Sequence, residues 1–423
     1  MDHTRKSRIL IAVALAIALT LPVPTVTAQT PSDTTKAATS DAIKLFIDSP
    51  VDDDYLKTEI TFADFVRDRV LADVYILVSS LNTASGGKEY TVTLQGQQRF
   101  KGMADTLRYV SKESDTEDML RIGLVKTMIA GLVRYVSRTS LAPQLNISLS
   151  KQEKQQTKVD KWNKWVFTIS ANGYFNGEQG YRYRNLWGSV SARRVTEKLK
   201  LNIAIYGSES RNRFWDDNSE TKSASDSKSF EVEPIFALND HWSWLAQVAG
   251  GSSTYSNRSS YLLGGLGVEY NIFPYSQSTR RQLRLDYDIT FRTIRYYRET
   301  IYYRTSENRW RENVSVALKI IQPWGSSDTQ IQFSHYLHDF DKNRLDIWSD
   351  VSLRVMQGLS LSLSGGYSKI HDQIGLPKGG ASPEDVLLRR SELETSYSYW
   401  TSIGLSYSFG SMYSDIVNPR FGD

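Results

Sequence analysis

The chain has 423 residues and a formal net charge of +4, a balance too close to neutral to indicate nucleic-acid binding. It contains no cysteine, so no disulfide can hold an exported form together. Mean hydropathy is negative, and after the first 28 residues no apolar run approaches the roughly 20 residues of a transmembrane helix, which argues against a helical membrane protein.

The N-terminus has the layout of a secretory signal peptide. Basic side chains precede the apolar run Ile9–Leu19, and small residues at 26–28 form a cleavage site. The run is shorter than the roughly 20 residues that span a bilayer. Pro22 and Pro24 would also interrupt a retained anchor helix. We therefore expect residues 1–28 to be removed on export.

Residues 29–40 are small and polar and predict a flexible tail, and residues 41–149 combine helix and strand patterns. The three consecutive aspartates Asp52–Asp54 are better interpreted as the N-terminal cap of a helix than as ligands of a metal ion. The expected elements are a strand at Ile43–Ile47, a helix from Asp52 to near Arg67, strands at Ala72–Ser79, Tyr90–Leu94 and Thr106–Val110, and a long helix capped at Ser114–Glu117.

The packed face of that long helix is expected to carry Met119, Ile122, Val125, Ile129, Leu132 and Tyr135, which recur at helical spacing. The resulting β-α-β-β-β-α order is similar to that of periplasmic α/β domains of the TolB type. The simplest interpretation of residues 41–149 is a packed module without catalysis. A charged linker, residues 150–161, separates this domain from the rest of the chain.

From residue 162 to residue 410 apolar and polar side chains alternate with period two, which places one set on each face of a strand. Residues 283–291 show the pattern, with Leu, Leu, Tyr, Ile and Phe alternating with Arg, Asp, Asp and Thr. We expect about 12 strands. Their predicted centres are near residues 169, 188, 203, 234, 246, 267, 287, 316, 333, 350, 362 and 403.

Strand length and link length favour a transmembrane barrel over a soluble sandwich. Strands of about 9 to 12 residues suffice to cross a bilayer at a tilt. Links after even-numbered strands are tight, whereas Ser208–Ser229, Arg292–Asn308 and Asp372–Glu392 are long and polar. Because an unpaired backbone group in hydrocarbon costs several kcal/mol, the sheet is expected to close. An even strand count then puts the N-terminal domain and the C-terminus in the periplasm.

Charged side chains fall mainly on one face of these strands. An Arg or Lys on the lipid face at mid-membrane would cost roughly 2–4 kcal/mol, so the charged face should point into the lumen. Pro234 removes one ladder donor, and a bulge would accommodate it. Arg193 and Lys200 are also expected inside. The main lumen-facing candidates are Glu231, Glu233, Glu269, Arg284, Asp286, Asp288, Lys319, Asp346, Asp350 and Arg354.

Two stretches carry a family resemblance. Residues 267–275, GVEYNIFPY, followed by Arg280–Leu283, resemble the DUF481 (YdiY-like) outer-membrane β-barrel family over roughly the barrel region. The resemblance implies outer-membrane location and no known activity. Tyr407–Phe409 resembles the aromatic-terminated signal read by the barrel assembly machinery. It departs from the usual pattern because a tail, residues 411–423, follows the barrel.

The expected function is therefore non-enzymatic: a barrel anchors a periplasmic domain, and its lumen is either a narrow channel or closed by paired charges. Expected partners are outer-membrane lipid, the assembly machinery and an envelope protein bound through residues 41–149, without a cofactor, metal or nucleic acid. The rival class is an outer-membrane phospholipase, with Ser334, His335, His338 and Asp339 near the outer rim. Ser334 and His335 are adjacent in a strand, so their side chains should point to opposite faces, which disfavours a catalytic pair.

Overall fold

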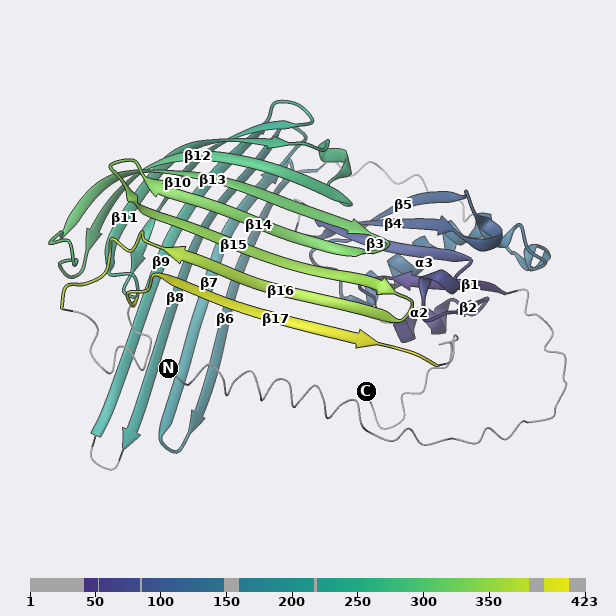
Figure 1. Cartoon of the computed structure of the whole chain (residues 1–423), viewed down its shortest axis with the longest axis horizontal. Helices are drawn as coiled ribbons and strands as arrows, with labels where there is room; N and C mark the ends of the chain where they lie inside the picture. Colours follow the sequence, from purple (N-terminus) through teal and green to yellow (C-terminus); the bar gives the residue numbers. More distant parts are fainter. Residues whose placement is uncertain are drawn as a thin grey trace, which may run out of the picture. The chain divides into compact units, whose positions relative to one another are not determined.

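The computed structural model describes residues 42–51, 53–83, 86–147, 160–216, 219–379 and 392–410. The expected signal peptide, flexible tail, most of the linker and the tail after the barrel lie outside the described residues. The described residues form two sheets (Figure 1), one of five strands and one of twelve. No helix in this part of the chain is long and apolar enough to cross a membrane.

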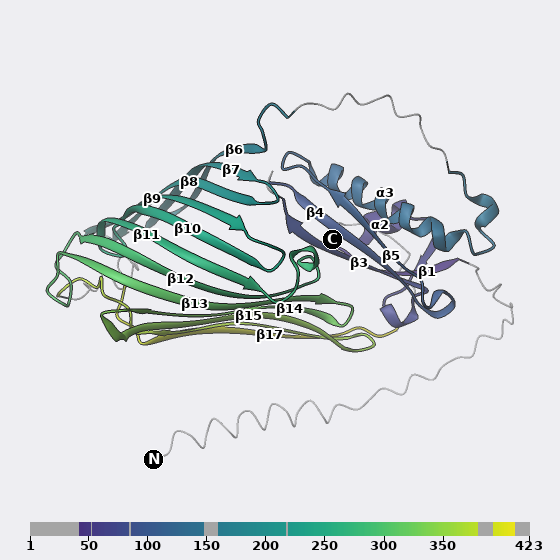
Figure 2. The same cartoon turned by 90° about the horizontal axis from the view of Figure 1, so that it is seen from above.

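The smaller sheet belongs to a mixed α/β domain. Its strand order is β2-β1-β3-β4-β5, with β1 parallel to β2 and to β3 and the other pairs antiparallel. Helix α3 packs along β4 and β5 (Figure 2). The elements are β1 (Ile43–Asp48), α2 (Asp53–Glu59), β2 (Ala63–Phe65), η1 (Arg69–Leu71), β3 (Val74–Asn82), β4 (Lys88–Gly96), η2 (Gln98–Phe100), β5 (Ala104–Val110), α3 (Glu117–Val136) and η3 (Ala142–Gln144).

The core of this domain lies between α3 and the sheet. Leu94 of β4 and Met128, Leu132 and Tyr135 of α3 are fully buried and belong to one apolar cluster. At Gly131 a Cβ atom would stand 2.7 Å from the Leu94 Cδ1 atom. A larger residue at this position would therefore force the Leu94 side chain to shift.

Two expectations for this domain are wrong in part. The first helix ends at Glu59 rather than near Arg67, and Ala63–Phe65 forms the extra strand β2. This segment pairs in parallel with β1, and its Phe65 is buried in the apolar core of the domain. Met119 is 52% exposed rather than packed, because the buried stripe of α3 starts at Leu124.

The larger sheet is antiparallel throughout and runs in chain order from β6 to β17. Figure 2 shows the strands following a strongly curved surface. The strands are β6 (Trp165–Glu178), β7 (Tyr181–Val195), β8 (Leu199–Asp216), β9 (Ser219–Ala237), β10 (Trp242–Ser253), β11 (Arg258–Asn271), β12 (Arg281–Tyr296), β13 (Ser306–Gln322), β14 (Gly325–Tyr336), β15 (Asp339–Met356), β16 (Leu359–Ile370) and β17 (Tyr397–Tyr407), with η4 (Tyr275–Gln277) between β11 and β12.

Each of the twelve predicted strand centres falls inside one of these strands. Four strands, β10, β14, β16 and β17, have 11 or 12 residues and match the expected length. The other eight are longer, up to 19 residues in β9. The predicted long link Ser208–Ser229 is wrong, because β8 continues to Asp216 and β9 begins at Ser219. Polar residues extend these strands through cross-strand ion pairs such as Arg211–Asp226, at 3.0 Å.

Pro234 is accommodated without the expected bulge. It lies opposite Leu201 of β8, and β9 keeps the same register with β10 on both sides of it. The missing N–H donor leaves only a local gap in the ladder, so the face on which each β9 side chain lies does not change.

Candidate functional site

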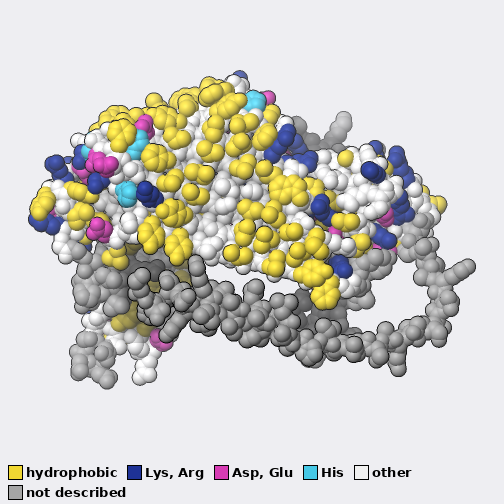
Figure 3. Space-filling view, in the orientation of Figure 1, with side chains coloured by type: hydrophobic (Ala, Val, Ile, Leu, Met, Phe, Trp, Pro, Cys, Tyr) yellow, Lys and Arg dark blue, Asp and Glu magenta, His cyan; other side chains and the backbone are white. Residues whose placement is uncertain are grey.

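The two faces of the large sheet differ in character. Leu266 of β11, Val314 of β13 and Ile331 of β14 lie on one face and are 60%, 47% and 42% exposed. Figure 3 shows apolar side chains spread over the viewed face, with charged side chains gathered toward its ends. An aqueous environment penalises such an apolar area, which is typical of a surface that contacts lipid or another protein.

The opposite face carries all of the charged residues predicted to line a lumen. The register links them strand by strand: Glu269 lies opposite Asp286, Asp286 opposite Ser315, and Ser315 opposite Gln332, which faces Asp346. The predicted residues are Glu231 and Glu233 on β9, Glu269 on β11, Arg284, Asp286 and Asp288 on β12, Lys319 on β13, and Asp346, Asp350 and Arg354 on β15. Arg193 and Lys200 share this polar face.

One cluster on the polar face joins β7, β8 and β9. Asn202 Nδ2 donates to Glu231 Oε1 at 2.8 Å, and the Tyr206 hydroxyl donates to the same oxygen at 3.1 Å. Arg193 Nε donates to Asn202 Oδ1 at 3.3 Å. The carboxylate of Glu231 is thus held by side chains from the neighbouring strand and does not point freely into solvent.

A second cluster is centred on Arg284 of β12. Its Nε atom lies 3.5 Å from Glu269 Oε2 and 3.1 Å from Asp286 Oδ2. Ser315 Oγ donates to Asp286 Oδ2 at 2.8 Å. Tyr275, in η4 beyond the strand ends, donates its hydroxyl to Glu269 Oε1 at 2.6 Å. Burial and this hydrogen bond raise the pKa of Tyr275 to about 12, so the hydroxyl stays a donor at physiological pH.

A third cluster lies at the other end of the strands, where the longer loops are. Arg311 of β13 donates through Nη2 to Ser334 Oγ at 2.5 Å and to Asp372 Oδ2 at 3.3 Å. Arg344 of β15 pairs with Asp346 at 2.7 Å and approaches Asp372 at 3.8 Å. Asp372 follows β16, so a loop carboxylate reaches two arginines of the polar face.

The segment 371–379 after β16 crosses to the loops of other strands. Asn257 Nδ2 donates to the Gly375 carbonyl at 3.0 Å, and the Ile301 N–H donates to the Leu376 carbonyl at 2.8 Å. Ile374 is buried against Ile294, Tyr296 and Tyr336. Sequence reasoning missed this arrangement, because the contacts join residues that are 38 to 118 positions apart and follow no local period.

Ser334 and His335 point to opposite faces, as predicted. Ser334 Oγ accepts from Arg311 on the polar face, whereas His335 Nε2 lies 2.6 Å from Glu312 Oε1 on the apolar face. The imidazole cannot serve as a base for this serine. The described residues contain no group of three or more His, Cys, Asp or Glu side chains arranged to hold a metal ion.

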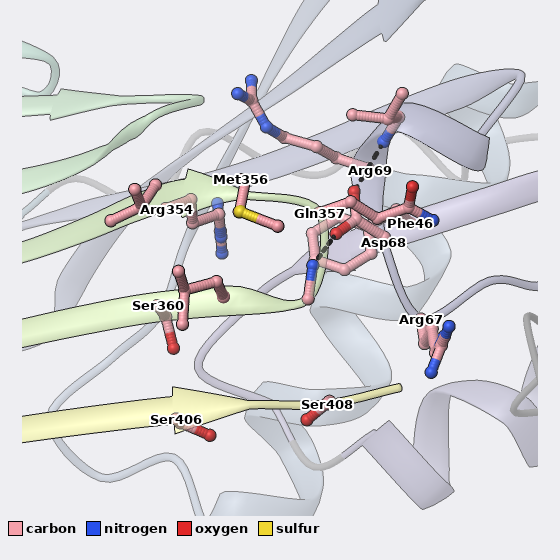
Figure 4. Close-up of a pocket in the computed structure, with 14 residues that line it drawn as sticks. Phe46, Arg67, Asp68, Arg69, Arg354, Met356, Gln357, Ser360, Ser406 and Ser408 are labelled. Carbon is pink, nitrogen blue, oxygen red and sulfur yellow. Dashed lines mark hydrogen bonds between the residues drawn. The ribbon is translucent and has the colours of Figure 1, made fainter. Parts of the chain in front are cut away.

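Arg354, at the short-turn end of β15, contacts the α/β domain. Its guanidinium lies 2.7 Å from Asp48 Oδ2, and the Tyr75 hydroxyl donates to the same oxygen at 3.1 Å. Burial, followed by the nearby Asp48 charge, raises the pKa of Tyr75 to about 12. The N–H of Gly358, in the β15–β16 turn, donates to Asp68 Oδ2 at 2.7 Å beside a cavity of about 230 Å³ (Figure 4). The sequence placed Arg354 on the polar face but gave no indication of these contacts.

No family model and no curated protein matches the chain. Among solved structures it is similar to the translocator domain of the autotransporter NalP from Neisseria meningitidis, at 11% identity over 58% of this chain and 87% of that one, with a TM-score of 0.27. It is also similar to the NanC porin, at 12% identity, 58% and 100% coverage and a TM-score of 0.26. A third is CdiB from Acinetobacter baumannii, at 9% identity, 86% and 74% coverage and a TM-score of 0.28. Because these TM-scores are low, the fold assignment rests on the strand pairing of this chain itself.

Proposed function

We propose that the chain is an outer-membrane β-barrel protein that holds its α/β domain in the periplasm. The observation that carries this proposal is the division of one long antiparallel sheet into a polar face and an exposed apolar face. Lipid accepts the apolar face, and the polar face then lines an aqueous interior. The predicted signal peptide, residues 1–28, and the resemblance of residues 267–275 and 280–283 to the DUF481 family also support this proposal.

Closure of the sheet is part of the proposal. Strands β6 and β17 stand at the two ends of the strand order, and among the described residues neither has a partner on its outer edge. In hydrocarbon each unpaired backbone group costs several kcal/mol, so an open edge of 11 residues is not tolerated. Pairing of β6 with β17 removes both edges at once and gives a twelve-stranded barrel.

The short turns then face the periplasm, on the same side as the α/β domain. The contacts of Arg354 with Asp48 and of Gly358 with Asp68 support this orientation, since both lie at the short-turn end of the sheet. No residue is assigned a catalytic role. Two partners are proposed: the barrel assembly machinery, and a periplasmic envelope protein that binds residues 41–149. The interior of the barrel is proposed to form a narrow channel.

The first test is heat-modifiable migration of the full chain extracted from outer membranes. A folded barrel resists the detergent of the gel, so the unheated sample should migrate differently from the boiled one. Fractionation of the envelope should place the same band with the outer membrane. Identical migration of heated and unheated samples, or recovery in the soluble periplasm, would contradict the proposal.

The channel is tested separately. Purified protein in planar bilayers should give discrete conductance steps if the polar face lines a continuous pore. A heat-modifiable protein that gives no steps would overturn the channel and leave the barrel in place.

A further inference from the structure

The polar face is rich in arginine at the loop end. Arg258, Arg292, Arg309, Arg311 and Arg344 all lie there, each fixed by its register in β11, β12, β13 or β15. In most of a barrel interior such charges are neutralised by facing carboxylates, as Arg284 is by Glu269 and Asp286. At the loop end the neutralisation is incomplete.

Three of the five arginines have acidic partners. Arg309 pairs with Glu307 at 2.7 Å, and Arg311 and Arg344 pair with carboxylates of the β15–β17 region. Within the described residues, Arg258 and Arg292 form no salt bridge. Arg292 Nε donates only to the hydroxyl of Thr290, at 3.2 Å.

The neighbours of Arg292 increase the positive charge around it. Arg311 of β13 lies opposite Thr290, two residues from Arg292 on the same face, and Arg258 of β11 lies opposite Tyr296 on that face. The nearest acidic residue on this face of β12 is Asp288, four residues away. Asp288 already accepts a hydrogen bond at 2.9 Å from Nδ2 of Asn313, which lies directly opposite it on β13. A half-buried guanidinium with two basic neighbours is stabilised when an anion joins it.

The segment 371–379 supplies one such anion from within the chain. Its Asp372 carboxylate accepts a hydrogen bond from Arg311, and the apolar Ile374 nearby is buried on the same surface. The segment is therefore held against the polar face partly by carboxylate–guanidinium contacts of Asp372 with Arg311 and, at 3.8 Å, with Arg344. A dissolved oxyanion can replace the contact with Arg311 in kind.

We propose that the loop end of the polar face is a binding site for small oxyanions, with Arg258, Arg292 and Arg311 as ligands and Asp372 as a competing internal carboxylate. A phosphate or carboxylate group that enters the site binds the two unpaired arginines and displaces Asp372 from Arg311. This inference rests on the proposed function in that the polar face must line an aqueous interior. Beyond the proposed function, the inference names small anions as the class of ligand. It also names the contact of Asp372 with Arg311 as one that anion binding releases.

Titration of the folded full-length protein with inorganic phosphate, in micelles of an uncharged detergent, tests the site directly. Wild type should bind phosphate, and Arg292→Gln and Arg258→Gln should each weaken binding about tenfold, since each removes one charge-assisted contact. Asp372→Asn should tighten binding, because the competing charge is gone while the side-chain shape is kept. Arg295→Gln is the matched control, since Arg295 is on the same strand as Arg292 but on the opposite face.

Absence of phosphate binding by heat-modifiable wild type would overturn the inference, as would equal affinities of wild type, Arg292→Gln and Asp372→Asn. Heat-modifiable migration of each variant separates loss of the site from loss of folding. Conductance separates the site from the channel. Phosphate binding without conductance steps would contradict the proposed channel but support the anion site. Conductance steps without phosphate binding would support the channel but contradict the anion site.

Discussion

Ile331→Lys is expected to destabilise the folded protein in a bilayer by about 2–4 kcal/mol, whereas Gln330→Lys should change its stability little. The two residues are adjacent on β14 and lie on opposite faces. Ile331 stands between Val316 and Ile347 on the apolar face. A lysine there has to be accommodated in hydrocarbon, away from water and from any counter-ion.

Gln330 provides a closely matched control. It lies on the polar face opposite Ala317, whose short side chain leaves room for a lysine. Asp328 and Asp350 are on the same face and can offset the new charge. The measurement is equilibrium unfolding in urea of both variants folded into lipid vesicles. Equal loss of stability in the two variants would contradict the assignment of the Ile331 face to lipid and the Gln330 face to the interior. A larger loss for Gln330→Lys would indicate the opposite assignment.

Met128→Ala should destabilise the α/β domain by about 2–5 kcal/mol, because it removes a fully buried side chain and leaves a cavity. Met119→Ala, on the same helix, should change stability by no more than about 0.5 kcal/mol, since Met119 is 52% exposed. Both substitutions delete the same atoms from α3, so the difference reports burial rather than helix propensity.

Hydrogen exchange of α3 peptides in the folded full-length protein measures this difference. Met128→Ala should speed exchange across residues 117–136, and Met119→Ala should leave it near the wild-type rate. The heat-modifiable migration of the barrel should be the same in both variants. Comparable exchange in the two variants would show that the core of the domain does not lie where α3 meets β4 and β5.

The alternation of side chains predicted a large part of this fold. Period two identifies both the existence of a strand and the face of each residue, so twelve strand centres and the shared face of Glu231, Asp286 and Arg354 follow from it. The outer halves of β8 and β9 escaped prediction because both of their faces are polar there. An ion pair such as Arg211–Asp226 replaces the apolar pattern on which strand prediction depends.

The loop-end cluster could be predicted only in part. The register of β12 and β13 places Arg292 and Arg311 on neighbouring strands of one face. The contact of Asp372 with Arg311 depends on the path of the segment 371–379, which follows no local sequence period. The same holds for Arg354, whose partner Asp48 lies in the other sheet, and for Met119, whose exposure depends on where α3 meets its neighbours.

Disulfide trapping between β6 and β17 tests barrel closure most directly. The chain has no cysteine of its own, so any disulfide within one chain must form between the two introduced cysteines. Ile169→Cys is combined in turn with Cys at Tyr399, Thr401, Ile403 or Leu405, which all lie on the apolar face. Paired strands bring facing Cβ atoms to roughly 4.5–5.5 Å, within reach of a disulfide.

A closed barrel predicts that one of these pairs forms an intramolecular disulfide in outer membranes, seen as a reducible mobility shift of the single chain. The control pair of Ile169→Cys with Ser402→Cys places the two thiols on opposite faces and should not react. Disulfides in none of the four pairs, or disulfides only between two copies of the chain, would contradict a twelve-stranded barrel closed by its own first and last strands.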